Sequence, residues 1–175
     1  DPKNNLYKIL ISDDRSTDDT IDYIKKIRSS KKIRIMINKR NLGYGGNIKK
    51  CLSYGIKNKF DYAIMIHGDD QYDAKYIPNM VKKLKNPKID IVTGSRMLNK
   101  KEARKGGMPL YKFIGNIVLT KIFNLVCKTN FTDCHTGLWG YNLNIFKYIN
   151  LKKIDNAFNF DNHLRINAIN HKLKI

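Results

Sequence analysis

The sequence has few cysteines, and they are not arranged in pairs. Its 175 residues contain only Cys51, Cys127 and Cys134, an odd number with no C-x-x-C motif. This pattern excludes a disulfide framework and a zinc site built from cysteines. Reduced thiols are typical of the cytosol, so we expect a cytoplasmic protein.

Long apolar runs and low-complexity segments are also missing. The longest apolar stretch, Phe113 to Cys127, is interrupted by Asn116, Lys121 and Asn124, and a spanning helix needs about 20 apolar residues. We therefore expect no segment that crosses a bilayer. With four prolines and no internal repeat, the length predicts a single domain over residues 1–175.

Acidic residues are strongly outnumbered, with 15 Asp and Glu against 34 Lys and Arg, which gives a formal charge of +19. Such a charge favours anionic partners, namely nucleic acid, lipid headgroups or phosphorylated substrates. The lysines are dispersed, and a general compositional bias towards Lys, Asn and Ile explains them equally well. A nucleic-acid-binding domain remains an alternative interpretation, although no basic and aromatic motif that reads bases is present.

Short apolar runs alternate with segments of helical periodicity. Strands are predicted at 7–12, 33–37, 62–66 and 89–93, and helical patterns lie between them. This order predicts an α/β fold with a mainly parallel sheet and helices on both faces. After Arg96 the pattern changes to a basic, Gly-rich segment at 99–109 and a long helix at about 110–127.

Two acidic pairs follow predicted strands, Asp13 with Asp14 and Asp69 with Asp70. If the strands are neighbours, these carboxylates lie close together and repel one another unless a cation shares the site. A divalent ion with oxygen ligands, completed by a substrate diphosphate, satisfies them. His67 precedes Asp69 by two positions and points to the same side in an extended chain; it is either a metal ligand or a hydrogen-bonding neighbour of one.

Six motifs resemble, in order, those of a family 2 glycosyltransferase of the GT-A fold, in particular the polyprenyl-phosphate sugar transferases such as dolichol-phosphate mannose synthase. They are SDDRSTDDT, NLGYGGN, HGDDQYD, TGSR, TDCHTGLWGYN and FDNHLRINAINHKLKI. The resemblance implies an inverting, metal-dependent hexosyltransferase of cell-envelope biosynthesis. It implies a UDP- or GDP-sugar donor, Mg²⁺ or Mn²⁺, a lipid-phosphate or glycan acceptor, and a location at the cytoplasmic face of the membrane.

The resemblance also assigns residues to the nucleotide-sugar side, taken as residues 1–96. Asp69 matches the last Asp of the family's metal motif, and His67 stands where the first Asp is expected. Arg96 is expected to neutralise the leaving diphosphate, with a surface ion pair as the alternative. The remaining donor contacts are Asp13, Asp14 and Gly43.

The second half, residues 97–175, is expected to bind the acceptor. Asp161 matches the family's general base, with Phe160 in place of a Glu, and capping of the last helix is the alternative. The acceptor-side residues are Asp133, His135 and Trp139. Trp139 stands where lipid-phosphate transferases usually have an Arg; it either stacks on a sugar or packs in the core.

Three further expectations complete the interpretation. Lys112 and Lys121 flank apolar residues of the long helix, which suits either a membrane surface or a helix that faces the core. The resemblance implies that the family's first strand and its C-terminal end are not in this chain. A nucleotidyltransferase is a further alternative, but it requires a Gly-rich basic loop near the first strand, and none is present.

Overall fold

A computed structural model of the chain describes residues 7–27 and 32–175. The fold is α/β, as predicted, and the four expected strands form within about two residues of their predicted bounds. In chain order the elements are β1 (Ile9–Asp13), α1 (Thr20–Lys26), β2 (Ile33–Ile37), α2 (Tyr44–Lys57), β3 (Tyr62–Met65), the 3₁₀ turn η1 (Ala74–Tyr76), α3 (Ile77–Leu84), β4 (Ile91–Thr93), α4 (Lys100–Lys105), α5 (Leu110–Cys127), β5 (Trp139–Asn142), η2 (Leu143–Lys147), η3 (Leu151–Lys153) and α6 (Phe160–Asn170).

The strands of the described residues form two small sheets, so the expectation of a mainly parallel sheet is wrong. β1 pairs with β2 in parallel, and Ile9 lies opposite Ile33. The second sheet has the order β3-β5-β4 and is antiparallel at both pairings, with Trp139 opposite both Met65 and Thr93. The reason is β5, a strand that the sequence pattern did not predict, which inserts between β3 and β4 and runs against both.

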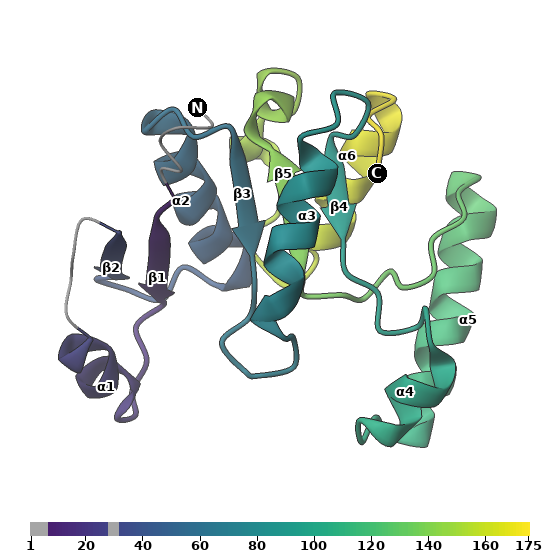
Figure 1. The fold of residues 1–175 in the computed structure, drawn as a ribbon, viewed down its shortest axis with the longest axis horizontal. Coiled ribbons are helices and arrows are strands. Elements are labelled where there is room, and N and C mark those ends of the chain that lie inside the picture. The colour runs from purple at the N-terminus through teal and green to yellow at the C-terminus, as the bar shows by residue number, and fades with distance from the viewer. Residues whose placement is uncertain (1–6, 28–31) are drawn as a thin grey trace.

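Helices cover both faces of the three-stranded sheet, as predicted (Figure 1). Side chains alternate along a strand, and Trp139 and Tyr141 of β5 belong to the buried core that α2 and α6 complete. Gly140, between them, faces α3. A Cβ at Gly140 would lie 2.8 Å from Ile64 Cδ1 and 3.0 Å from Leu84 Cδ1, so the glycine allows α3 to approach the sheet closely.

The N-terminus of α2 is held against the segment that precedes α6. Gly43 has a φ of 76°, and a Cβ there would lie 2.9 Å from the Asn156 carbonyl oxygen. A Cβ at Gly45 would lie 2.5 Å from the Asp155 carbonyl oxygen. The glycines of NLGYGGN therefore bring α2 beside α6, although the two helices are far apart in sequence.

The helices α4 and α5 lie at one side of the molecule, away from β1 and β2 (Figure 1). α5 ends at Lys128, whose φ of 51° is left-handed. With 18 residues and a mean hydropathy of 1.3, α5 is long and apolar enough to cross a membrane by length and composition alone, a measure that its interrupted sequence was expected to fail. Only 11% of it is buried.

Candidate functional site

One large cavity, of about 1460 Å³, lies among β1, β3 and the start of α6. It brings together six of the residues predicted from the sequence: Asp14, His67, Asp69, Arg96, His135 and Asp161. The other four, Asp13, Gly43, Asp133 and Trp139, do not line it. The sequence therefore located this cavity correctly, and the structure separates the residues that face it from those behind its wall.

Asp13 is bound by its own turn. Its Oδ1 accepts hydrogen bonds from the backbone N–H groups of Arg15 (2.9 Å) and Ser16 (3.0 Å), and its Oδ2 accepts one from the Ser16 hydroxyl. Arg15 has a positive φ of 69°, which this arrangement stabilises. Asp13 thus holds the shape of the turn after β1, and its side chain is buried.

Asp14, the next residue, points to the following loop and the cavity. Its Oδ1 accepts hydrogen bonds from Asn38 Nδ2 and from the Leu42 N–H, each at 2.8 Å. Asn38 also donates to Asn47 Oδ1 at 3.0 Å, and Asn47 Oδ1 accepts the Ser12 hydroxyl at 2.7 Å. This amide network ties the end of β1 to the start of α2 and orients Asp14.

Asp69 and His67 face each other at the end of β3. His67 Nδ1 lies 3.9 Å from Asp69 Oδ2, and the Asp69 side chain is 45% exposed. The next residue, Asp70, has a positive φ of 59°. Within the described residues no three His, Cys, Asp or Glu side chains gather into a group that could hold a metal, so Asp69 and His67 fit an ion only if a substrate or water supplies the other ligands.

Asp161 begins α6 and is joined to His67 by a tyrosine that the sequence interpretation missed. The Tyr44 hydroxyl donates to Asp161 Oδ2 at 2.7 Å and lies 3.0 Å from His67 Nε2. In the described part of the chain, Asp161 Oδ1 is buried and has no partner. The cap of α6 is Asn159, so the alternative role of Asp161 as a helix cap does not fit its position.

Burial sets the electrostatics of this chain of groups. Removal from water raises the pKa of Asp161 above its ordinary value, although the hydrogen bond from Tyr44 and the nearby Arg165 act in the opposite direction. Burial and the adjacent Asp161 likewise raise the pKa of Tyr44, so its hydroxyl stays protonated. A carboxylate with a raised pKa at the edge of a cavity is suited to accept a proton.

The single proton of Tyr44 determines the tautomer of His67. Because that proton is donated to Asp161, the Tyr44 oxygen must accept a hydrogen from His67 Nε2. A neutral His67 then presents the lone pair of Nδ1 towards Asp69. A lone pair and a carboxylate oxygen repel each other at 3.9 Å, so this arrangement favours a cation between them.

Arg96 is held at the cavity by Asp133, which lies behind it. Arg96 Nε lies 3.2 Å from Asp133 Oδ2, and Arg96 Nη2 donates to the His135 carbonyl oxygen at 2.5 Å. Asp133 also accepts hydrogen bonds from Asn116 Nδ2 and the His135 N–H, each at 2.8 Å. Asp133 thus positions Arg96 and His135 without facing the cavity, which is a different place from the acceptor contact predicted.

The hydrogen bonds of Asp133 decide its ionisation. Burial alone would raise its pKa, but the donors Asn116, the His135 N–H and Arg96 together hold the pKa below its ordinary value. The carboxylate therefore stays charged inside the protein.

Trp139 lies in the core and has no exposed surface, so the structure agrees with its packing alternative and leaves no face on which a sugar could stack. Its ring packs on Tyr141, and its Nε1 donates to the Thr136 carbonyl oxygen at 2.9 Å. The guanidinium of Arg165, also fully buried, lies 4.7 Å from the Trp139 ring centroid. Arg165 donates to the Cys134 carbonyl oxygen at 2.9 Å, so it stabilises the segment before β5 from α6.

Aromatic and glycine residues around His67 were also missed. Its ring lies edge-on to Tyr44 and Tyr72, and the Tyr72 hydroxyl accepts the Gly137 N–H at 2.6 Å. A Cβ at Gly137 would come within 2.4 Å of the His67 ring. Phe158 stacks on Tyr44 and is 87% exposed, so it offers a flat apolar surface to a ligand. Only tertiary structure brings these residues together, and no spacing in the sequence indicates it.

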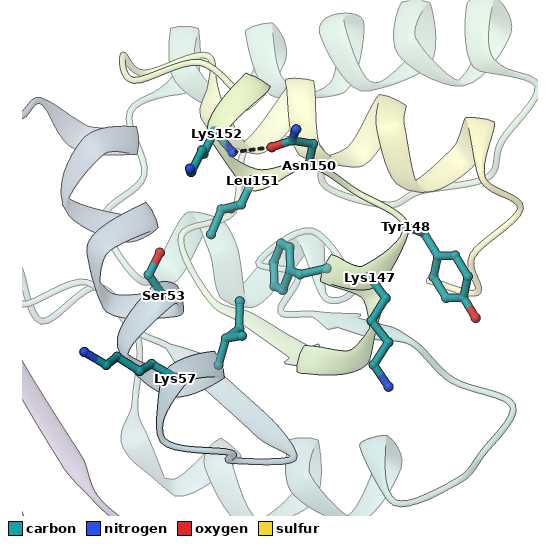
Figure 2. A pocket seen from close by; sticks show the side chains of 9 residues that line it. Ser53, Lys57, Lys147, Tyr148, Asn150, Leu151 and Lys152 are labelled. Carbon is teal, nitrogen blue, oxygen red and sulfur yellow. Dashed lines mark hydrogen bonds between the residues drawn. The ribbon is translucent and has the colours of Figure 1, made fainter.

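A second, smaller hollow of about 490 Å³ lies between α2 and the segment after β5 (Figure 2). It contains no carboxylate and no histidine, and its lining includes the lysines Lys57, Lys147 and Lys152. Figure 2 shows Lys57 and Lys147 extending away from each other, so they do not converge on one anion. The large cavity is therefore the candidate site.

Comparison with known proteins agrees with this location. The family model described as glycosyl transferase family 2 matches residues 3–149, which is most of the chain and includes the ends of β1, β3 and β4. The chain therefore belongs to glycosyl transferase family 2. Membership implies the GT-A fold and a sugar-transferring enzyme, and Asp161 lies beyond the matched residues.

Relatives with printed activities are also glycosyltransferases. The UDP-N-acetylglucosamine–dolichyl-phosphate N-acetylglucosaminyltransferase of Methanococcus voltae is 27% identical over 163 residues, which cover 83% of this chain and 62% of that protein. The low-salt glycan biosynthesis hexosyltransferase Agl6 of Haloferax volcanii is 27% identical over 135 residues, covering 76% and 30%.

An uncharacterized protein of Methanocaldococcus jannaschii matches 99% of the chain at 28% identity, over 69% of its own length. The chain thus spans about a third to two thirds of the length of these three relatives.

Proposed function

We propose that this chain transfers a sugar from a nucleotide diphosphate sugar to a lipid-phosphate acceptor at a membrane face. One observation carries the proposal: a single cavity collects Asp14, His67, Asp69, Arg96 and Asp161 in a chain of family 2. The name of the M. voltae relative, with its UDP-sugar donor and dolichyl-phosphate acceptor, supports the same substrate classes here.

The nucleotide is proposed to bind at residues 1–96. Asp14 offers its free carboxylate surface to the nucleoside, and Asn38 and the Leu42 N–H fix the orientation of that side chain. Arg96, whose position is fixed by Asp133, contributes a cation for the phosphate groups, since a guanidinium matches phosphate oxygens well. Gly43 supports this side indirectly by letting α2 begin close to Asn156.

A divalent ion, Mg²⁺ or Mn²⁺, is proposed at Asp69 and His67. The lone pair of His67 Nδ1 and the Asp69 carboxylate, which face each other, provide two ligands, and such ions commonly complete their coordination with substrate phosphates and water. When bound, the ion would neutralise charge that develops on the departing diphosphate.

Residues 97–175 are proposed to serve the acceptor. Asp161 holds its Oδ2 on Tyr44 and keeps Oδ1 without a partner in the described structure, so Oδ1 is available to accept the proton of an attacking hydroxyl. Attack from the side opposite the diphosphate would invert the anomeric centre. With an acceptor that is already an ionised phosphate, this proton transfer matters less, and Asp161 then mainly orients Tyr44 and His67.

The experiment is a titration of the chain with UDP and GDP in the presence and absence of Mn²⁺ or Mg²⁺, followed by calorimetry. We expect binding that the metal strengthens, and loss of that metal dependence in Asp69→Ala. Asp73→Ala, an exposed carboxylate in the same loop region, serves as the matched control. Metal-dependent binding that survives unchanged in Asp69→Ala would remove Asp69 from the proposed site.

A further inference from the structure

The helix α5 has its polar side chains inside and its apolar side chains outside. On the inner face Asn116 Nδ2 donates to Asp133 Oδ1 at 2.8 Å, and the Thr120 hydroxyl donates to Asn116 Oδ1 at 3.1 Å. Asn124 exchanges hydrogen bonds with the Phe131 backbone, at 2.8 and 2.9 Å. A surface helix in water has the opposite arrangement, with its apolar face towards the core.

The outer face is a continuous apolar stripe. Its eight large side chains are all exposed: Leu110, Tyr111, Ile114, Val118, Leu119, Ile122, Leu125 and Val126. Leu125 is 81% exposed and Val126 74%. Single exposed apolar residues are ordinary, but a contiguous apolar surface of this kind marks an interaction site.

Charge distribution identifies the partner. Lys112 and Lys121 are nine residues apart, so at 3.6 residues per turn they lie on roughly opposite sides of α5. Both are exposed, and Ile114, Val118 and Leu125 lie on the arc between them. No Asp or Glu occurs from Ala103 to Thr132. Lysines at both margins of an apolar helix face are typical of helices that lie in the headgroup region of anionic membranes.

We propose that α5 docks on an anionic lipid bilayer with its axis in the plane of the membrane. The inner face remains hydrogen-bonded to Asp133 and the backbone of Phe131, so the helix cannot be surrounded by lipid on all sides, although it is long enough to span. Lys100, Lys101 and Arg104 of the adjacent α4 are also exposed and add attraction to acidic headgroups.

This docking deepens the proposed function, and it rests on that function only for the nature of the acceptor. Asp133 connects the docked helix to the cavity, because one carboxylate binds both Asn116 of α5 and Arg96. A lipid-phosphate acceptor would therefore reach the site from the same surface on which α5 lies.

The test is flotation of the chain with vesicles of phosphatidylcholine and phosphatidylglycerol that contain neither donor nor acceptor. We expect binding, and a triple variant, Ile114→Gln/Val118→Gln/Leu125→Gln, should lose roughly tenfold in partition coefficient for each side chain. The matched control is Ile56→Gln/Tyr148→Gln, two exposed apolar residues outside α5, which should bind as the unmodified chain does. Nucleoside diphosphate binding should be retained by all of these variants.

Each result has a defined reading. Equal flotation of the triple variant and the unmodified chain would mean that charge alone drives binding, and would overturn the proposal. A dimer in sedimentation that the triple variant converts to monomer, without vesicle binding by either, would show that a second copy covers the stripe. Lys112→Gln/Lys121→Gln should weaken binding several-fold to anionic vesicles only. Because no sugar is transferred in this assay, its failure would leave the proposed function standing.

Discussion

Two buried carboxylates on either side of the cavity wall have opposite surroundings. Asp133 accepts hydrogen bonds from a side-chain amide, a backbone N–H and a guanidinium, which hold its pKa below the ordinary value. Asp161 accepts one, from Tyr44, and its Oδ1 has no partner among the described residues. Burial therefore raises the pKa of Asp161.

The difference separates a carboxylate that builds the site from one that is available to react. A buried polar atom without a partner costs free energy, and such an atom at the edge of a cavity is explained if a ligand supplies the missing hydrogen bond. Asp133 has no such vacancy, so its contribution is the positioning of Arg96, His135 and α5. Sequence alone placed both residues in the same class of substrate contact.

Replacement of Asp161 by Asn should have the largest effect on activity. If Asp161 accepts the proton of an acceptor hydroxyl, we expect kcat to fall by about three orders of magnitude, within the range typical of general-base catalysis. Nucleoside diphosphate affinity should stay within a factor of about two, since Asp161 does not contact the diphosphate in this proposal. The assay is release of nucleoside diphosphate from UDP- or GDP-sugars.

The same variant tests the pKa of Asp161 through stability. Because its folded pKa is raised, the carboxyl loses favourable free energy as pH rises from its unfolded value towards the folded one. Asp161→Asn removes this loss, so it should be more stable than the unmodified chain at neutral pH and gain less at acidic pH. An Asp161→Asn variant that is fully active would show that the acceptor is an already ionised group.

Replacement of Asp133 by Ala should mainly reduce stability. It leaves the Arg96 guanidinium and Asn116 without their shared partner, and removing one member of a buried ion pair costs about 3 kcal/mol or more in free energy of unfolding. Urea denaturation followed by circular dichroism measures this cost. Asp22→Asn, an exposed carboxylate, is the control and should change stability by less than about 0.5 kcal/mol.

The sign of the pH dependence is opposite to that of Asp161. The folded pKa of Asp133 is lowered, so its stabilisation is present above the unfolded pKa and is lost as pH falls through the folded one. The stability difference between the unmodified chain and Asp133→Ala should therefore shrink in acid. A difference that is independent of pH would indicate that packing, and not charge, explains the effect of Asp133.

The fold and the cavity were partly accessible from sequence because local rules determine them. Apolar runs that end in Asp14 and Asp69 predicted strand ends at a common site, and both residues line the cavity. β5 was missed because its four residues, WGYN, follow a loop rich in polar residues and glycine, and only pairing with β3 and β4 makes them a strand. Periodicity detected α5 but could not say that its polar face is the inner one, which depends on Asp133.

Tyr44 could not be predicted because its partners come from distant parts of the chain, and its replacement by Phe should have a smaller, more specific effect. Loss of the hydroxyl removes the one hydrogen bond that lowers the pKa of Asp161. It also releases His67 Nε2. If ionised Asp161 is needed, the acidic limb of the activity profile should move to higher pH, with a loss of about tenfold near neutral pH, as expected for one charged hydrogen bond.

The measurement for Tyr44→Phe is kcat/KM as a function of pH, with Tyr54→Phe as the control because Tyr54 also lies along α2 and its hydroxyl contacts only the exposed Lys8 among the described side chains. Unchanged profiles in both variants would separate Asp161 from Tyr44 and His67. A shift confined to Tyr44→Phe, accompanied by weaker metal dependence, would link the proton on Asp161 to the lone pair that His67 presents to Asp69. That coupling joins the two ends of the cavity, and a carboxylate saturated with donors, such as Asp133, could not provide it.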